Sequence, residues 1–331
     1  MTAVESGLVA IVREFLAAHR LLRRVGERYR SGQLAFEEVG ELVGDGEESV
    51  LFRLKETSHA LFRGERGEGA IGATALFDLA VGSLFHEAMK FRENFYQRSA
   101  YGPKVQALRR AAVRDDGGLL PEFEKLLAAA AIRIDESLQE LDTLLVQTTA
   151  QFRVLLAAHA HEGVLARVLV ARGQELADVL GRSVDSLFAD LYGEPAAAWS
   201  CAGRSLLASG FYVEAAATLR ESERRGRSGA DEARLRAYAQ GMSAYLAGHY
   251  EEAVAGLVTW LDASPDPLPA VERPLAQQAA AALARVGALA GSGSREAAAA
   301  VLGLDRLRAR DPSLAAAPAS APRPRSSTAS G

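Results

Sequence analysis

The segment WSCAGRSLLASGFYVEAAATL, residues 199–219, resembles the segment AYAQGMSAYLAGHYEEAVAGL, residues 237–257, with a constant offset of 38 positions (199 to 237). Among the identical residues at equivalent positions are Gly203 and Gly241, Gly210 and Gly248, Tyr212 and Tyr250, Ala215 and Ala253, and Leu219 and Leu257. A motif that recurs at a fixed spacing is typical of stacked supersecondary units, each of which buries an apolar face against its neighbour. Because glycine and alanine permit close approach of two backbones, we expect tightly paired helices here.

The composition is that of an ordinary globular protein. The chain has 331 residues, of which 49% are hydrophobic and 24% are charged, and its net charge is −4. This length allows two domains, and the charge balance gives no reason to expect binding to nucleic acid or to an anionic membrane. No apolar run is long enough to predict membrane insertion. The single cysteine, Cys201, excludes an internal disulfide framework and favours a cytoplasmic location. The abundance of arginine over lysine, with much alanine and glycine, indicates a GC-rich bacterial genome.

Residues 1–193 are predicted to form a bundle of helices. In the first helix, apolar side chains recur every three, four or seven positions, and Gly32 follows its end: Leu8, Val12, Phe15, Leu22, Val25 and Tyr29. Long helices are expected over 70–97 and 122–158, and Pro103 is expected to stop the first because proline removes a backbone donor. One further helix is expected over 164–192, and Gly193-Glu194-Pro195 marks the expected domain boundary.

The predicted helix over 122–158 carries an apolar seam that keeps a three–four alternation, with spacings of three, four or seven between its members. The seam consists of Leu127, Ile134, Leu138, Leu141, Leu145, Phe152 and Leu155. Such a seam is typical of a coiled-coil-like hairpin or bundle. A structural protein that assembles with other copies through this seam is therefore one alternative.

The repeated segments resemble the tetratricopeptide repeat (TPR) family, whose unit is a helix–turn–helix of about 34 residues. Trp199, Gly203, Gly210, Tyr212, Ala215 and Leu219 match the pattern of that family in the first unit. The second unit matches from Gly241 to Leu257 and ends at Pro265, although Ala237 stands at the tryptophan position. A weaker third unit is expected from helices over 275–289 and 295–308, with Gly293, Ala298 and Leu302 in register.

The resemblance implies that the first helix of each unit lines a concave groove. The residues that it places there are Ser200, Arg204 and Leu207 in the first unit and Leu235, Tyr238, Met242 and Tyr245 in the second. Arginine, tyrosine and methionine are suited to interfaces, so a partner's amphipathic helix or apolar peptide is the expected ligand. The alternative is that the helix predicted over 164–192 packs on this face and makes these residues part of the core.

A second candidate site lies in the bundle. Glu56 and His59 share one face of a predicted helix, and His86 and Glu87 lie on the next helix. If the two helices pack antiparallel, these groups could form a ligand or metal site. The segment from Gly67 to Gly72 has the spacing G-x-G-x-x-G, but the expected preceding element is a helix rather than the strand that a dinucleotide site requires.

We therefore expect an all-α protein with three parts: an N-terminal helical bundle (1–193), a short TPR-like α-solenoid (194–310) and a disordered C-terminal tail (311–331), which is rich in proline, alanine, serine and arginine. The expected function is that of a non-enzymatic cytoplasmic adaptor without catalytic residues, metal or cofactor. The alternative is a helical-bundle regulator or a ligand-binding protein with its site at Glu56, His59, His86 and Glu87. An oligomer of this chain remains open.

Overall fold

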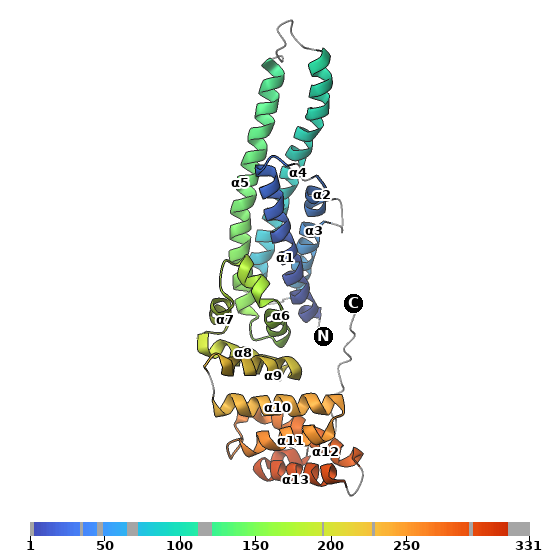
Figure 1. The fold of residues 1–331 in the computed structure, drawn as a ribbon, viewed down its shortest axis with the longest axis vertical. Helices are drawn as coiled ribbons and strands as arrows, with labels where there is room; N and C mark the ends of the chain where they lie inside the picture. The colour runs from blue at the N-terminus through green and yellow to red at the C-terminus, as the bar shows by residue number, and fades with distance from the viewer. Residues whose placement is uncertain are drawn as a thin grey trace. The chain divides into compact units, whose positions relative to one another are not determined.

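Apolar side chains at helical spacing give an all-α structure in the computed structural model (Figure 1). The structure describes residues 3–33, 36–44, 49–64, 72–111, 121–193, 195–226, 229–290 and 294–316. Over these ranges the regular elements are helices, and none of the described residues forms a strand. Among the described helices, none has the length and apolar character needed to cross a membrane.

The chain divides into two compact units that each combine separate stretches of sequence. The first unit comprises residues 1–159 and 174–182, and the second comprises residues 160–173 and 183–331. The boundary expected at residue 193 lies inside the second unit. The region with the repeated sequence thus shares its unit with residues 160–173 and with the short helix that precedes residue 193.

Five helices make up most of the first unit: α1 (Ala3–Arg30), α2 (Phe36–Val43), α3 (Val50–Gly64), α4 (Ala73–Ala111) and α5 (Pro121–Ala158). The predicted apolar stripe of α1 faces the core, and Phe15 is 1% exposed. The Phe15 ring stacks on Phe152 of α5 with centroids 3.9 Å apart and contacts Phe77 of α4 edge-on. Such aromatic pairs stabilise a core beyond the burial of their area.

The break predicted at Pro103 is wrong, because α4 continues to Ala111. A proline removes only one intrahelical donor, at a cost of about 3 kcal/mol, and the hydrogen bonds of the turns on both sides can still form. Figure 1 shows α4 and α5 as a long antiparallel hairpin. The Thr148 hydroxyl donates to the Ala80 carbonyl at 3.4 Å, and the Asn94 amide donates to Ser137 at 3.1 Å.

The helix predicted over 122–158 is confirmed as α5. From Ile134 to Leu155 its predicted seam is buried except for the half-buried Leu145, and it packs inside the first unit, since Phe152 contacts α1 and α4. Over this range the seam residues belong to the core of one chain and are not free to pair with another copy.

The single helix predicted over 164–192 is two helices, α6 (Gly163–Val179) and α7 (Val184–Tyr192). Gly181 adopts a φ of +64°, which ends α6, and the Ser183 hydroxyl accepts a hydrogen bond from the Ser186 amide to cap α7. Apolar periodicity alone did not predict that a glycine would end one helix and a serine would cap the next. Within α6, Arg172 has non-helical backbone angles, and the boundary between the two units follows directly after Gly173.

The repeated sequence forms two helical hairpins in the second unit: α8 (Pro195–Ala208) with α9 (Tyr212–Arg224), and α10 (Ala230–Ala247) with α11 (Tyr250–Asp262). Both turns have the same backbone. Gly210 and Gly248 adopt φ values of +78° and +81°, and each amide donates to the carbonyl three residues earlier. Residues that are 38 positions apart in the sequence therefore also have the same local backbone geometry at these turns.

Repeated glycines lie where the paired helices touch. A Cβ atom on Gly203 would come within 2.8 Å of the Leu219 side chain, and one on Gly241 would come within 2.8 Å of the Leu257 amide nitrogen. Gly256 faces Gly241 equally closely. The predicted role of small residues at the helix contact is confirmed.

The helices expected for a third unit are present as α12 (Arg273–Leu289) and α13 (Arg295–Arg310), although Gly293 lies outside the described residues. Two short 3-10 segments flank them, η2 (Ala270–Glu272) and η3 (Pro312–Ala316). The expectation of disorder from residue 311 is wrong for its first part. Leu314 is 2% exposed, and Asp311 accepts hydrogen bonds from the amide and hydroxyl of Ser313. Residues 317–331 lie outside the described part of the chain.

Candidate functional site

Most of the residues that the sequence placed in a groove lie together in the structure, but they are buried rather than open to a ligand. Five of them belong to one core cluster and are between 0% and 8% exposed: Leu207, Leu235, Tyr238, Met242 and Tyr245. Ser200 is buried as well, and its hydroxyl donates to Glu232 at 2.8 Å. Arg204 is half-exposed and lies 3.8 Å from Asp231. The face of α10 that we expected to be open is therefore occupied.

Helix α12 contributes polar contacts to this face. The hydroxyls of Tyr212 and Tyr238, from two successive hairpins, donate to the Gln278 side-chain oxygen at 2.8 and 3.0 Å. Tyr238 also lies 3.2 Å from the Leu275 carbonyl oxygen. Small and apolar side chains of α12 belong to the same core cluster, and each is at most 1% exposed: Ala276, Ala279, Ala282, Leu283 and Val286. Tyrosines of two hairpins thus share one polar anchor on a helix whose small side chains lie in the core of the unit.

The tyrosines form an aromatic row beneath α12. Tyr238 contacts Tyr212 and Trp260 edge-on, with ring centroids 6.1 and 5.1 Å away. Burial raises the pKa of Tyr238 well above its ordinary value, and burial also raises the pKa values of Tyr212 and Tyr245. These hydroxyls therefore remain neutral donors at physiological pH, as recognition of a carbonyl or amide oxygen requires.

The first half of α6 belongs to the same unit, but its polar contacts are with α9 and the turn before it rather than with the groove face on which the sequence alternative placed this helix. Ala166 is fully buried in the shared core cluster. Arg167 forms an ion pair with Glu214 at 2.7 Å, and its guanidinium lies 4.9 Å from the centre of the Phe211 ring. This half-helix therefore fastens to the turn between α8 and α9.

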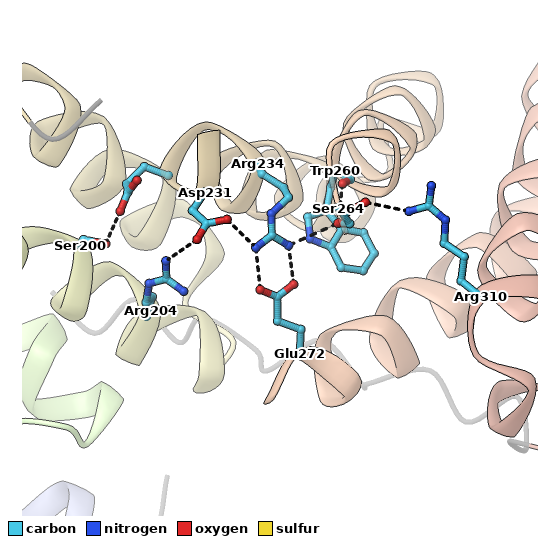
Figure 2. Close-up of polar contacts among 9 residues, drawn as sticks. Ser200, Arg204, Asp231, Arg234, Trp260, Ser264, Glu272 and Arg310 are labelled. Atoms are coloured by element: carbon cyan, nitrogen blue, oxygen red, sulfur yellow. Dashed lines mark hydrogen bonds and ion pairs between the residues drawn. The ribbon is translucent and has the colours of Figure 1, made fainter. Parts of the chain in front are cut away.

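A buried ion pair holds the start of α12 against α10 (Figure 2). The Arg234 guanidinium makes two hydrogen bonds to the Glu272 carboxylate, and the one from Nη2 to Oε1 is 2.6 Å long. Only 3% of the Arg234 side chain and 8% of the Glu272 side chain are exposed. The hydrogen bond to Glu272 raises the pKa of Arg234, so the guanidinium stays charged. A two-pronged pair of this kind fixes geometry as well as adding energy.

Further polar contacts extend from this pair (Figure 2). Arg234 donates to the Ser264 hydroxyl at 3.3 Å, and that hydroxyl donates to the Trp260 carbonyl at 2.7 Å. Arg310 of α13 donates to the carbonyls of Leu261 and Ser264 at 2.6 and 3.1 Å. Arg310 thereby satisfies carbonyl groups at the end of α11 that have no partner within the helix.

Sequence reasoning missed this network. Arg234 and Glu272 are 38 positions apart, and a proline-rich segment separates them, so no helical spacing connects the two. The available signal was weak: an arginine flanked by Leu235 and Tyr238 stands on an otherwise apolar face. A charge in such a position requires a buried partner of opposite sign.

The second candidate site predicted from the sequence is not assembled as expected. His59 Nδ1 lies 3.1 Å from the Asp78 carboxylate, and Asp78 is only 7% exposed. His86 is eight residues, or about 12 Å of helix, beyond Asp78, and it is exposed to solvent. Glu87 accepts a hydrogen bond from Lys90 at 2.9 Å instead. Glu56 is also exposed.

The described residues contain no group of three histidine, cysteine, aspartate or glutamate side chains arranged to hold a metal ion. Most of the G-x-G-x-x-G segment, residues 67–71, lies outside the described residues. At this face, tyrosine, leucine and methionine side chains share one buried core cluster with the alanine-rich helix α12. No family model, curated protein or solved structure matches this chain, so the resemblance to TPR proteins stays a prediction from the sequence.

Proposed function

We propose that this protein is a non-enzymatic adaptor whose helical hairpins bind a helix of a partner protein, and that α12 occupies the binding face in the free chain. One observation carries the proposal: hydroxyls from two successive hairpins converge on the side-chain oxygen of Gln278. Recognition of a helix in an apolar groove is a recurrent mode of peptide binding. A cytoplasmic location is part of the proposal.

The contacts of α12 define the partner that this face accepts. Its buried residues Ala276, Ala279, Leu283 and Val286 follow spacings of three, four and three, which place them along one side of the helix. Gln278 is the polar anchor, and at about 100° per residue it lies about 120° around the helix from the centre of this row. A partner helix with small side chains at the first two positions and an amide at the anchor position would make the same contacts.

The Arg234–Glu272 pair controls whether α12 stays in place. It joins α10 to the residue immediately before α12 and is almost fully shielded from water. Removal of one member of a buried pair leaves an unpaired charge, with a cost of about 3–5 kcal/mol. A partner that displaces α12 therefore competes with both the tyrosine contacts and this ion pair.

The test uses a fluorescent peptide of residues 273–290 and the full-length protein. In the wild-type chain α12 blocks the face, and we expect little change in fluorescence anisotropy. Ala279→Arg places a cation at a fully buried position and should release α12, so that the peptide binds in trans. Gln277→Arg alters an exposed position of the same helix and is the matched control, which should behave as wild type.

A second peptide tests the anchor. Replacement of the glutamine that corresponds to Gln278 by alanine removes the acceptor of both tyrosine hydroxyls, and affinity for the Ala279→Arg protein should fall about tenfold. Circular dichroism establishes that this protein remains helical. If a folded Ala279→Arg protein fails to bind the unaltered peptide, the face is ordinary core and the adaptor proposal fails.

A further inference from the structure

Among the described residues, the outward face of α13 carries a stripe of exposed side chains. Its residues follow spacings of three and four and are all exposed: Arg295, Ala298, Leu302, Asp305 and Ala309. Leu302 is 62% exposed, and Val301 beside it is 51% exposed. The end of α12 lies beside Val301, because a Cβ atom on Gly287 would be 3.5 Å from that side chain. Leu289, two residues further along α12, is 55% exposed at the same end of the unit.

The opposite face of α13 is already used. Ala297, Ala300, Gly303, Leu304 and Leu307 are buried, and Gly303 lies against Val258 of α11 and Leu283 of α12. Figure 1 shows α13 at the outer edge of the helices of the second unit. Exposed leucine and valine at this position indicate an interaction surface.

The charges on the stripe are arranged symmetrically about its centre. Arg295 lies five residues before Ala300 and Asp305 lies five residues after it, while Ala298 and Leu302 lie two residues on either side. Among the described residues Arg295 has no carboxylate within ion-pair distance, and the cation that pairs with Asp305 is Arg308, at 4.0 Å in the same helix. The stripe is therefore complementary to an antiparallel copy of itself.

We propose that two copies of this chain associate through α13, with the two helices antiparallel and crossing at the level of Ala300. Arg295 of each copy then faces Asp305 of the other, and Leu302 of each copy packs against Ala298 of the other. The two charged positions are about 15 Å apart along the helix, so both ion pairs form at the same time. Such an interface uses one patch on both copies, as two-fold dimers do. The proposal is independent of the proposed adaptor function.

The test measures the mass of the full-length protein in solution by sedimentation over a range of concentrations. We expect a dimer for the wild-type chain. Leu302→Glu places two like charges in the centre of the interface and should give a monomer. Val213→Glu makes the same change on α9, where Val213 is 66% exposed, and should leave the dimer intact.

Charge reversal distinguishes this interface from a non-specific apolar contact. Arg295→Asp creates two repulsive contacts and should raise the dissociation constant at least about tenfold, as should Asp305→Arg. The double variant restores both ion pairs with opposite polarity and should recover the wild-type dissociation constant. Arg295→Asp lies at the start of α13, where an acidic residue favours the helix, so loss of the dimer cannot be attributed to loss of the helix.

A wild-type chain that stays monomeric at every concentration would overturn the proposal. A dimer that survives Leu302→Glu would also overturn it, as would a double variant that is no better than the single reversals. Circular dichroism of each variant confirms that the helices are retained, so that each result reports on association alone.

Discussion

At the scale of single residues, the contact between Gly241 and Gly256 sets how closely α10 and α11 approach. A Cβ atom on Gly241 would meet backbone atoms of Ala253 and Leu257 at 3.0 and 2.8 Å, and backbone cannot rotate away as a side chain can. We therefore expect Gly241→Ala to lower the free energy of unfolding by about 2 kcal/mol or more. Chemical denaturation measures this loss.

The control for this substitution is Gly82→Ala in α4. Gly82 also lies inside a helix, but a Cβ atom there would meet nothing within 4 Å. Alanine stabilises such positions by about 0.5–1 kcal/mol, so the two variants should shift stability in opposite directions. Equal losses in both would contradict the proposed role of close approach in the hairpin.

His19 makes the first unit sensitive to acid. Its side chain is 7% exposed, and burial, with a smaller contribution from Arg23, lowers its pKa from 6.5 to about 4. Between these values the unfolded chain binds a proton that the folded chain does not, so stability is full above pH 6.5 and falls as the pH approaches 4. At about pH 5 the expected loss is about 1–2 kcal/mol.

Replacement of His19 by leucine removes this titration. Urea unfolding of the wild type and of His19→Leu at about pH 7 and about pH 5 measures the difference, and we expect the variant to lose about 1–2 kcal/mol less than the wild type on acidification. Identical losses in both proteins would show that other groups cause the acid sensitivity.

At the scale of elements, the Arg234–Glu272 pair fixes the position of α12. Glu272→Gln keeps the size of the side chain but leaves the arginine charge without its buried counter-ion, so we expect a loss of about 3–5 kcal/mol in the unfolding of the second unit. The double variant Arg234→Met with Glu272→Leu removes both charges and should recover most of that loss. A Glu272→Gln protein as stable as the wild type would contradict the role assigned to the pair.

Helices with strong apolar periodicity were predictable from the sequence. Helix ends that depend on one or two particular residues were harder to predict. The repeats at 199–219 and 237–257 predicted the hairpins and their close contacts, because small residues at a constant offset mark the points where paired helices touch. The end of α4 was wrongly predicted because one proline does not outweigh helical turns on both sides. The division between α6 and α7 depends on the backbone of Gly181 and the cap at Ser183, which periodicity does not detect.

The candidate site was predicted in part. The family resemblance identified the face that carries Tyr238, Met242 and Tyr245, and these three residues lie in one core cluster. It could not identify what covers that face, because α12 lies beyond a segment with no helical spacing, residues 263–272. The contacts of Gln278 and Glu272 depend on how this segment directs the chain, and no local pattern encodes that direction.

At the scale of the whole molecule, each unit is assembled from two separate stretches of the chain. A fragment that begins at residue 194 lacks Ala166 and its half-helix, and it lacks Phe188, whose ring stacks on Trp199 at 4.2 Å. A fragment of residues 160–331 retains both contacts. We expect the longer fragment to melt at a distinctly higher temperature, and calorimetry of the two fragments measures the difference. Equal melting temperatures would contradict the assignment of residues 160–173 to the second unit.

The kinked helix α6 has a consequence for the order of events during synthesis. The ribosome delivers residues 160–173 before residues 174–182, yet the earlier stretch belongs to the unit that is completed last. Domains usually fold in the order in which they are translated. During synthesis the first unit must therefore fold before residues 160–173 can pack. The surface against which these residues pack is formed by later residues that are still in the ribosomal exit tunnel.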